Sequence, residues 1–321
     1  MKKRFFCIAL VMVLSFIMLF FGACSIGPGD DDVRIVCTTF AQYDWVKNIL
    51  VSVDGYDLIL LNPNGVDLHN YQPSVEDIIT IKNCDLFLFV GGESEKWVKD
   101  ILEEDQNILY VNLIETLGER VKFIPHHHDE EDHSHDEHEA VDEHVWLSLK
   151  NAIFYVNHIA QTLMTLDEEN SQTFLNNAQK YCESLERLDL QYEKVVQNGR
   201  VNTIVFSDRF PFRYLLEDYG IEYYAAFEGC SSETEVTPAT IINLANVLDQ
   251  LLLKYVFVTE EQNTDIAQSV INTTQSKNQK ILTLDSMQSV TNVDIKNGVT
   301  YLGIMTDNLQ LISQALRNAE V

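Results

Sequence analysis

A long stretch without helix breakers constrains the fold of this chain more than any other feature. From Glu168 to Gln197 the sequence contains neither Pro nor Gly, and Asp167 before it is a predicted N-cap. Apolar side chains recur along it at spacings of four and three, which places them on one stripe of a helix roughly 45 Å long. The stripe residues are Phe174, Ala178, Tyr181, Leu185, Leu188, Tyr192 and Val195. Because the stripe is short and aromatic, we expect packing within one chain rather than a coiled-coil dimer seam, and hence a monomer.

Short apolar runs alternate with helix-period segments on both sides of this stretch. The predicted strands are 34–38, 57–61, 85–90, 201–206, 223–227, 255–258 and 281–284. Two intervening helices carry capping signals, since Ser74 precedes Asp77 by three residues and Thr237 precedes Pro238. Such alternation predicts two Rossmann-like α/β lobes with mostly parallel sheets, joined by one long rigid helix. The predicted boundaries are 33–167 for the N-lobe, 168–198 for the linking helix and 199–321 for the C-lobe.

The N-terminus reads as an export signal. Lys2, Lys3 and Arg4 precede an apolar run that ends at Phe21, and small residues follow before Cys24. This order is typical of a secretory signal peptide, here 1–23, and the run is shorter than the about 20 residues of a membrane span. Cys24 resembles the lipidated cysteine of a bacterial lipobox, which makes 24–32 a lipidated Cys and tether. We expect an extracytoplasmic protein anchored to the cell membrane, at a bacterial surface or in a periplasm. The alternative is an uncleaved anchor helix.

Charge and cysteine content exclude two classes of protein. The formal net charge is -27, and nucleic-acid binding needs a basic face, so nucleic acid is not an expected partner. Beyond the N-terminus the cysteines are Cys37, Cys84, Cys182 and Cys230, and none forms a CxxC pair. So sparse a set is not a disulfide scaffold, although one disulfide or four thiols are both compatible with it.

Histidines gather in one acidic tract between residues 126 and 139. Its imidazoles are His126, His127, His128, His133, His135 and His138. No apolar residue interrupts 126–138, which predicts a loop outside the core. Imidazole is a common ligand for borderline metal ions, and clustered carboxylates attract cations. We expect this loop to collect metal loosely, at more than one stoichiometry.

Two further histidines lie where α/β sheets place ligands. His69 follows a predicted strand in a turn-rich segment, and His144 lies where the acidic tract returns to ordered chain. Loops at the carboxyl ends of strands are the usual ligand sites of such sheets. His158 lies on a predicted helix, and we interpret it as structural.

Several strings resemble one family along the whole mature chain. They are GVDLHNYQPS (65–74), CDLFLFVGGESEKWV (84–98), DEHVWLSLKNA (142–152), DRFPFRYLLEDYG (208–220), GCSSETE (229–235) and LDSMQS (284–289). In these strings and the His-rich insertion, the chain resembles the ZnuA/TroA-like (cluster A-I) metal-binding lipoproteins of zinc ABC transporters. The resemblance implies two α/β lobes on one rigid helix, a metal in the cleft between the lobes, and a membrane permease as partner.

The resemblance also implies a ligand set. The metal histidines of the family's N-lobe fall on His69 and His144, and its late carboxylate falls on Asp285. The family's third His, in an HxAF-like segment, is missing here. Asp208 is the nearest substitute, Glu228 is a second, and a water or a loop histidine is a third.

This ligand set fits borderline metal ions. Two imidazoles with one or two carboxylates form a tetrahedral N/O site suited to Zn²⁺. Replacing a His ligand by Asp shifts the preference toward harder ions, so Mn²⁺ is the alternative metal. Asp67 and Glu143, each near a predicted ligand, either orient it or are solvated loop acids.

The leading functional hypothesis is a protein that captures Zn²⁺ and delivers it to an ABC-type permease. An extracytoplasmic zinc hydrolase has a similar metal site, but neither GxSxG nor HExxH occurs and no general base lies on a recognisable motif, so we expect no enzyme. A surface adhesin or structural lipoprotein with an incidental His tract is the third interpretation.

Overall fold

The computed structural model describes residues 32–104, 108–124, 140–227, 229, 236–259 and 264–318. The predicted signal peptide, the lipidation site Cys24, the His-rich loop, Glu228 and Cys230 lie outside these residues. Among the residues described, no helix has the length and apolar character needed to cross a membrane. Cys37, Cys84 and Cys182 are free thiols.

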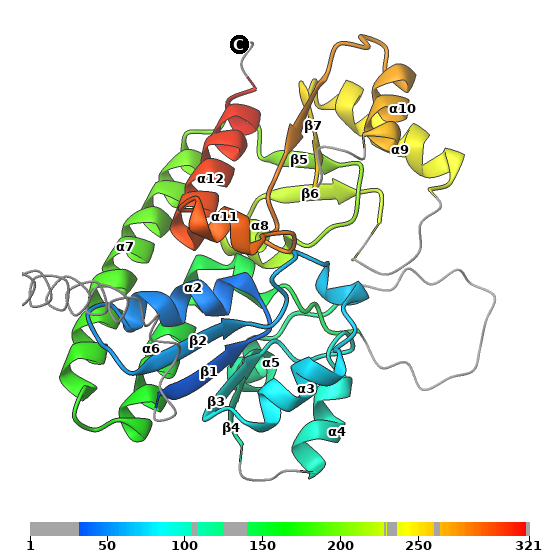
Figure 1. The fold of residues 1–321 in the computed structure, drawn as a ribbon. Coiled ribbons are helices and arrows are strands. Elements are labelled where there is room, and N and C mark those ends of the chain that lie inside the picture. Colours follow the sequence, from blue (N-terminus) through cyan, green and yellow to red (C-terminus); the bar gives the residue numbers. More distant parts are fainter. Residues whose placement is uncertain are drawn as a thin grey trace, which may run out of the picture.

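The N-lobe is built on a four-stranded parallel sheet in the order β2-β1-β3-β4 (Figure 1). Its strands are β1 (Val33–Cys37), β2 (Tyr56–Leu60), β3 (Leu86–Phe89) and β4 (Leu109–Asn112). Ile35 of β1 pairs with Leu58 of β2 and with Leu86 of β3. All four residues of β3 are buried, as expected for a central parallel strand that is apolar on both faces.

The C-lobe repeats this plan with the order β6-β5-β7-β8. Its strands are β5 (Thr203–Phe206), β6 (Glu222–Ala225), β7 (Tyr255–Val258) and β8 (Lys280–Thr283), and all pair in parallel. The two parallel sheets with flanking helices confirm the predicted α/β class with two lobes.

The helices flank both sheets. They are α2 (Phe40–Ile49), α3 (Val75–Lys82), α4 (Trp97–Glu104), α5 (Leu113–Leu117), α6 (Leu149–Leu166), α7 (Ser171–Gln197), α8 (Arg213–Asp218), α9 (Pro238–Gln250), α10 (Asp265–Thr273), α11 (Asn292–Lys296) and α12 (Tyr301–Arg317), with 3-10 turns η1 (Leu68–Asn70), η2 (Gly118–Arg120) and η3 (Val145–Leu147). The capping box predicted for α3 is present, because Ser74 and Asp77 bond reciprocally. The Thr237 hydroxyl caps α9, with Pro238 in its first turn.

One predicted cap is wrong. Asp167 is the C-cap of α6, and α7 begins at Ser171 with Asn170 as its N-cap. The Asp167 carboxylate accepts a hydrogen bond from the Asn170 backbone N–H at 3.0 Å, so it closes the turn between two helices. Because that turn contains neither Pro nor Gly, no breaker residue marks the end of one helix and the start of the next.

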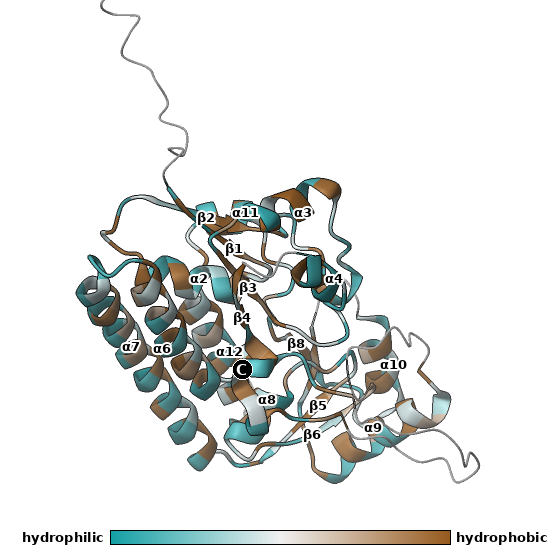
Figure 2. Cartoon of the chain, turned by 90° about the horizontal axis from the view of Figure 1, so that it is seen from below, coloured by the Kyte–Doolittle hydropathy of each residue, from teal (hydrophilic) through white to brown (hydrophobic). Residues whose placement is uncertain are grey.

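One apolar core joins the two lobes. It contains the inner faces of both sheets together with buried side chains of α2, α6, α7 and α12, and smaller cores lie on the outer faces. Helix α7 runs along both lobes beside α6 and α12 (Figure 1), and its hydrophilic positions face outward (Figure 2). Tyr181 of α7 bonds Asp44 of α2, while Tyr192 bonds the Met305 carbonyl of α12. The long helix therefore packs against both lobes within one chain.

Candidate metal centre

The two predicted N-lobe ligands lie next to each other, with their rings tilted by 56°. His69 belongs to η1, which follows β2, and His144 immediately precedes η3. Their Nε2 atoms are 3.2 Å apart, and their ring centroids are 5.2 Å apart. The His144 side chain is 3% exposed and the His69 side chain 21%, so the pair is reached from the His69 side.

Hydrogen bonds at Nδ1 fix how each ring presents its Nε2. His144 Nδ1 lies 2.8 Å from Asp142 Oδ1, and His69 Nδ1 lies 2.7 Å from Ser94 Oγ. Asp142 is an acceptor only, so the His144 proton sits on Nδ1 and the Nε2 lone pair faces His69. Burial would raise the pKa of Asp142, but His144 and Arg213 outweigh it and hold that pKa below its ordinary value.

Glu143 is buried behind this pair. Its Oε1 accepts from the Ser94 backbone N–H at 3.0 Å, and its Oε2 lies 3.7 Å from His69 Nδ1. Gly92, at φ +81°, leaves room for this carboxylate, since a Cβ there would overlap it. Glu143 is thus not a solvated loop acid, and it contributes negative charge on the far side of His69.

Asp208 lies at the end of β5 and is occupied by local hydrogen bonds. Its Oδ1 accepts from the Arg209 backbone N–H at 2.8 Å. Its Oδ2 accepts from the Thr259 N–H at 3.2 Å and from the Thr259 hydroxyl at 2.6 Å. The carboxylate therefore ties the loop after β5 to the end of β7.

Asp285 follows β8, and its side chain is likewise hydrogen-bonded within its own loop. Its Oδ1 accepts from the Met287 N–H at 2.7 Å, and its backbone exchanges hydrogen bonds with the Asn308 side chain. Although Asp285 keeps exposed surface, desolvation by the surrounding protein raises its pKa, and the charges of Asp294 and Asp307 add to this effect.

The C-lobe carboxylates do not join the histidine pair in this conformation. Within the parts of the chain that the structure describes, no group of three or more His, Cys, Asp or Glu side chains is arranged to hold a metal ion. His69 and His144 come together; Asp208 and Asp285 stay apart from them.

A small interlobe cavity of about 60 Å³ is lined by Asp67, two residues before His69. Residues from both lobes line it: Gly65, Asp67, Arg209, Pro211, Thr259, Ser286, Gln288 and Ser289. The Trp146 indole N–H donates to the Ser286 carbonyl at 3.0 Å, which brings the loop after β8 against η3. Asp67 and Asp142, each two residues before one of the histidines, also contact C-lobe arginines, so the histidine pair lies close to the junction of the lobes.

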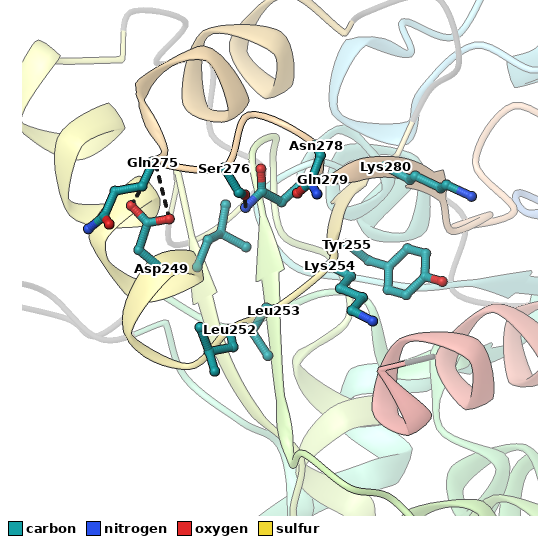
Figure 3. A pocket seen from close by; sticks show the side chains of 11 residues that line it. Asp249, Leu252, Leu253, Lys254, Tyr255, Gln275, Ser276, Asn278, Gln279 and Lys280 are labelled. Carbon is teal, nitrogen blue, oxygen red and sulfur yellow. Dashed lines mark hydrogen bonds between the residues drawn. The ribbon is translucent and has the colours of Figure 1, made fainter. Parts of the chain in front are cut away.

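A larger cavity, of about 530 Å³, has no metal-binding character. It lies in the C-lobe between the segments 248–255 and 275–280 (Figure 3). None of the described residues that line it is His or Cys. Its one carboxylate, Asp249, accepts two hydrogen bonds from the Gln275 backbone N–H.

Three residues around the histidines were not predicted from sequence. Ser94 bonds His69, while Arg209 and Arg213 reach the acids next to the histidines from the C-lobe. Ser94 lies in the string 84–98, but nothing in the spacing of these residues indicates the contacts.

Comparison with known proteins places the chain in a family. A family model described as "Zinc-uptake complex component A periplasmic" matches residues 35–315, which include both lobes and the histidine pair. The chain belongs to this family. Membership confirms the family resemblance that the sequence strings indicated.

Individual relatives agree with this assignment. The zinc-binding lipoprotein AdcA of Streptococcus pneumoniae is 29% identical over 309 residues, covering 95% of this chain and 60% of AdcA. The chain therefore spans about 60% of the length of that relative. The high-affinity zinc uptake system protein ZnuA of Bacillus subtilis is 24% identical over 288 residues, covering 89% of this chain and 88% of ZnuA.

Solved structures share the fold. The Zn(II)-bound ZnuA-like domain of Streptococcus pneumoniae AdcA superposes with a TM-score of 0.69 at 27% identity, covering 89% of this chain and 99% of that domain. The metal-dependent lipoprotein YcdH of Bacillus subtilis superposes with a TM-score of 0.73 at 23% identity, covering 89% of this chain and 100% of YcdH.

Proposed function

We propose that this protein captures Zn²⁺ between its lobes, with His69 and His144 as the N-lobe ligands. One distance carries the proposal, the 3.2 Å between the two Nε2 atoms. Two nitrogens that bind one zinc ion at 2.0–2.1 Å with tetrahedral angles lie about 3.3 Å apart. The two imidazoles are therefore already spaced as a zinc site requires, and they need little reorganisation to bind the ion.

Asp285 is the proposed C-lobe ligand, with Asp208 as the second candidate. The loop that carries Asp285 abuts η3 through the bond between Trp146 and Ser286, which supports its selection. Either carboxylate must exchange a local hydrogen bond for the metal. Two imidazoles and a carboxylate then give the N/O set that Zn²⁺ accepts, and Mn²⁺ is the competitor to test.

We propose that the captured Zn²⁺ is delivered to an ABC-type permease. It is supported by the family, whose description is that of a zinc-uptake complex component, and by relatives named as zinc-binding lipoproteins. We further propose that a lipid on Cys24 holds the protein at the membrane and that 126–139 collects zinc for the cleft.

Metal titration of the full chain, purified in detergent, tests the zinc proposal. Competition with a chromophoric chelator should reveal one tight zinc equivalent, held more tightly than manganese, beside weaker ones. Replacing His69 and His144 by Ala should abolish the tight equivalent, whereas His158→Ala, on α6, should leave it unchanged. A double variant that kept the tight equivalent would refute the assignment. Asp285→Asn and Asp208→Asn then identify the C-lobe ligand by which of them weakens binding.

A further inference from the structure

The same local arrangement occurs at both histidines. Each lies two residues after an aspartate, in Asp67-Leu68-His69 and Asp142-Glu143-His144. In each case Oδ1 of the aspartate accepts from the histidine backbone N–H, at 2.9 Å for Asp67 and 3.0 Å for Asp142. Each aspartate thereby fixes the backbone from which its histidine projects.

The second oxygen of each aspartate faces the other lobe. Asp67 Oδ2 accepts from Arg209 Nη1 at 3.1 Å, and Asp142 Oδ2 accepts from Arg213 Nε at 3.2 Å. Both arginines belong to the short segment that leads from β5 into α8. One C-lobe segment therefore contacts the anchors of both N-lobe histidines.

Because the two Asp–Arg pairs are largely buried, loss of either partner leaves the other side chain without a replacement. The side chains of Asp142 and Arg213 are 1% and 5% exposed, and those of Asp67 and Arg209 are 18% and 28% exposed. Little water is available to replace a lost partner, above all at Asp142. The planar guanidinium of Arg213 also bonds the Tyr223 hydroxyl at 2.5 Å, which fixes its orientation on the C-lobe.

We propose that Arg209 and Arg213 are positioning residues, which together hold His69 and His144 at the separation that zinc requires. This inference rests on the proposed zinc function and extends it, because it gives the C-lobe a role beyond supplying a ligand. The two Asp–Arg pairs couple the docking of the lobes to the geometry of the metal site. Gln288 Nε2 also donates to Asp67 Oδ1 at 3.1 Å from the C-lobe. Separation of the lobes removes these contacts from both histidine anchors, so it weakens zinc binding and favours zinc release.

The expected effects follow from the contacts. Loss of a partner that orients a metal ligand typically lowers metal affinity 10–100-fold. Arg209→Gln should raise the Kd for zinc about 10-fold, and Arg213→Gln should raise it further because its pair is more deeply buried. Arg209→Lys should restore part of the loss, since it keeps the charge.

The test combines zinc affinity with a measurement on the metal-free protein. Kd is measured by chelator competition on the full chain in detergent at a temperature where each variant is folded. Imidazole NMR signals of His69 and His144 are recorded without metal. Arg34→Gln is the matched control, because Arg34 forms an Asp–Arg pair with Asp57 inside the N-lobe. It should change neither Kd nor these signals.

A double-mutant cycle separates positioning from general loss of stability. With Asp67→Asn in the background, Arg209→Gln should have little further effect on Kd, whereas a purely structural role would lower the melting temperature and leave Kd unchanged. If the wild type binds zinc tightly and both arginine variants keep its Kd, the positioning role is refuted while the zinc proposal stands. If the wild type has no tight site, the zinc proposal fails, and the NMR signals still decide: unchanged histidine signals in Arg209→Gln and Arg213→Gln refute positioning.

Discussion

A buried glutamate near the histidine pair should make stability fall as the solution becomes neutral. Glu95 follows the Gly91-Gly92 turn and is 2% exposed. Its Oε2 accepts from the Gly91 backbone N–H at 2.7 Å, while its buried Oε1 has no hydrogen-bond partner in the described structure. Burial raises the pKa of Glu95 to about 7, and the charge of Glu143 adds to this effect.

The sign and size follow from the two protonation states. In the unfolded chain Glu95 titrates near 4.5, so between pH 4.5 and 7 the folded state holds a proton that the unfolded state has lost. Stability therefore falls as pH rises through this window, and it levels off above pH 7. At about 1.4 kcal/mol per pKa unit, the difference between 4.5 and about 7 corresponds to about 3 kcal/mol.

Urea unfolding of the metal-free protein between pH 4.5 and 8 measures this effect. Glu95→Gln cannot ionise, so its free energy of unfolding relative to wild type should increase by about 3 kcal/mol across the range. Glu103→Gln, at an exposed position on α4, should follow the wild-type curve. A constant difference between wild type and Glu95→Gln at every pH would refute the reasoning.

Three other expectations concern a glycine, a cap and the acidic tract. Gly92→Ala should cost about 2–3 kcal/mol in urea unfolding and weaken zinc binding, because its Cβ displaces Glu143, while Gly55→Ala, also at positive φ but in open space, should cost only about 1 kcal/mol. Equal costs would contradict the overlap. Thr237→Ala removes the cap of α9 and should cost about 1 kcal/mol by the same assay. Deleting 126–139 should remove the weak zinc equivalents in a chelator titration and keep the tight one; loss of the tight one would implicate the tract in the site.

Local signals predicted most of the fold. The strand 255–258 and the helix start at Thr237-Pro238 occur as predicted, because a fully apolar run and a capped proline depend on nearby residues alone. Asp167 was misassigned because the same side chain can begin a helix or close a turn after one. Whether Asp167 caps the start of α7 or closes the turn after α6 depends on the path that the chain takes between the two helices.

The candidate metal site was predictable in part. His69 and His144 were identified by their strand-end loops and by resemblance, and the structure brings them together. The Arg209 and Arg213 contacts span 142 and 71 residues in sequence, and they depend on how the lobes dock. No periodicity or motif encodes such a contact. The burial of Glu143 likewise depends on a glycine far away in sequence.

The bond between Asp44 and the first turn of α12 joins the N-lobe to a helix at the other end of the described chain. Asp44 accepts from the Tyr301 backbone N–H at 3.2 Å, across 257 residues, and the Trp45 ring next to it packs edge-on against Tyr301. Apart from this contact, α2 packs against α6, α7 and the strands β1 and β2. The contact with α12 is the part of the surroundings of α2 that needs nearly the whole chain, and contacts of such long range form slowly.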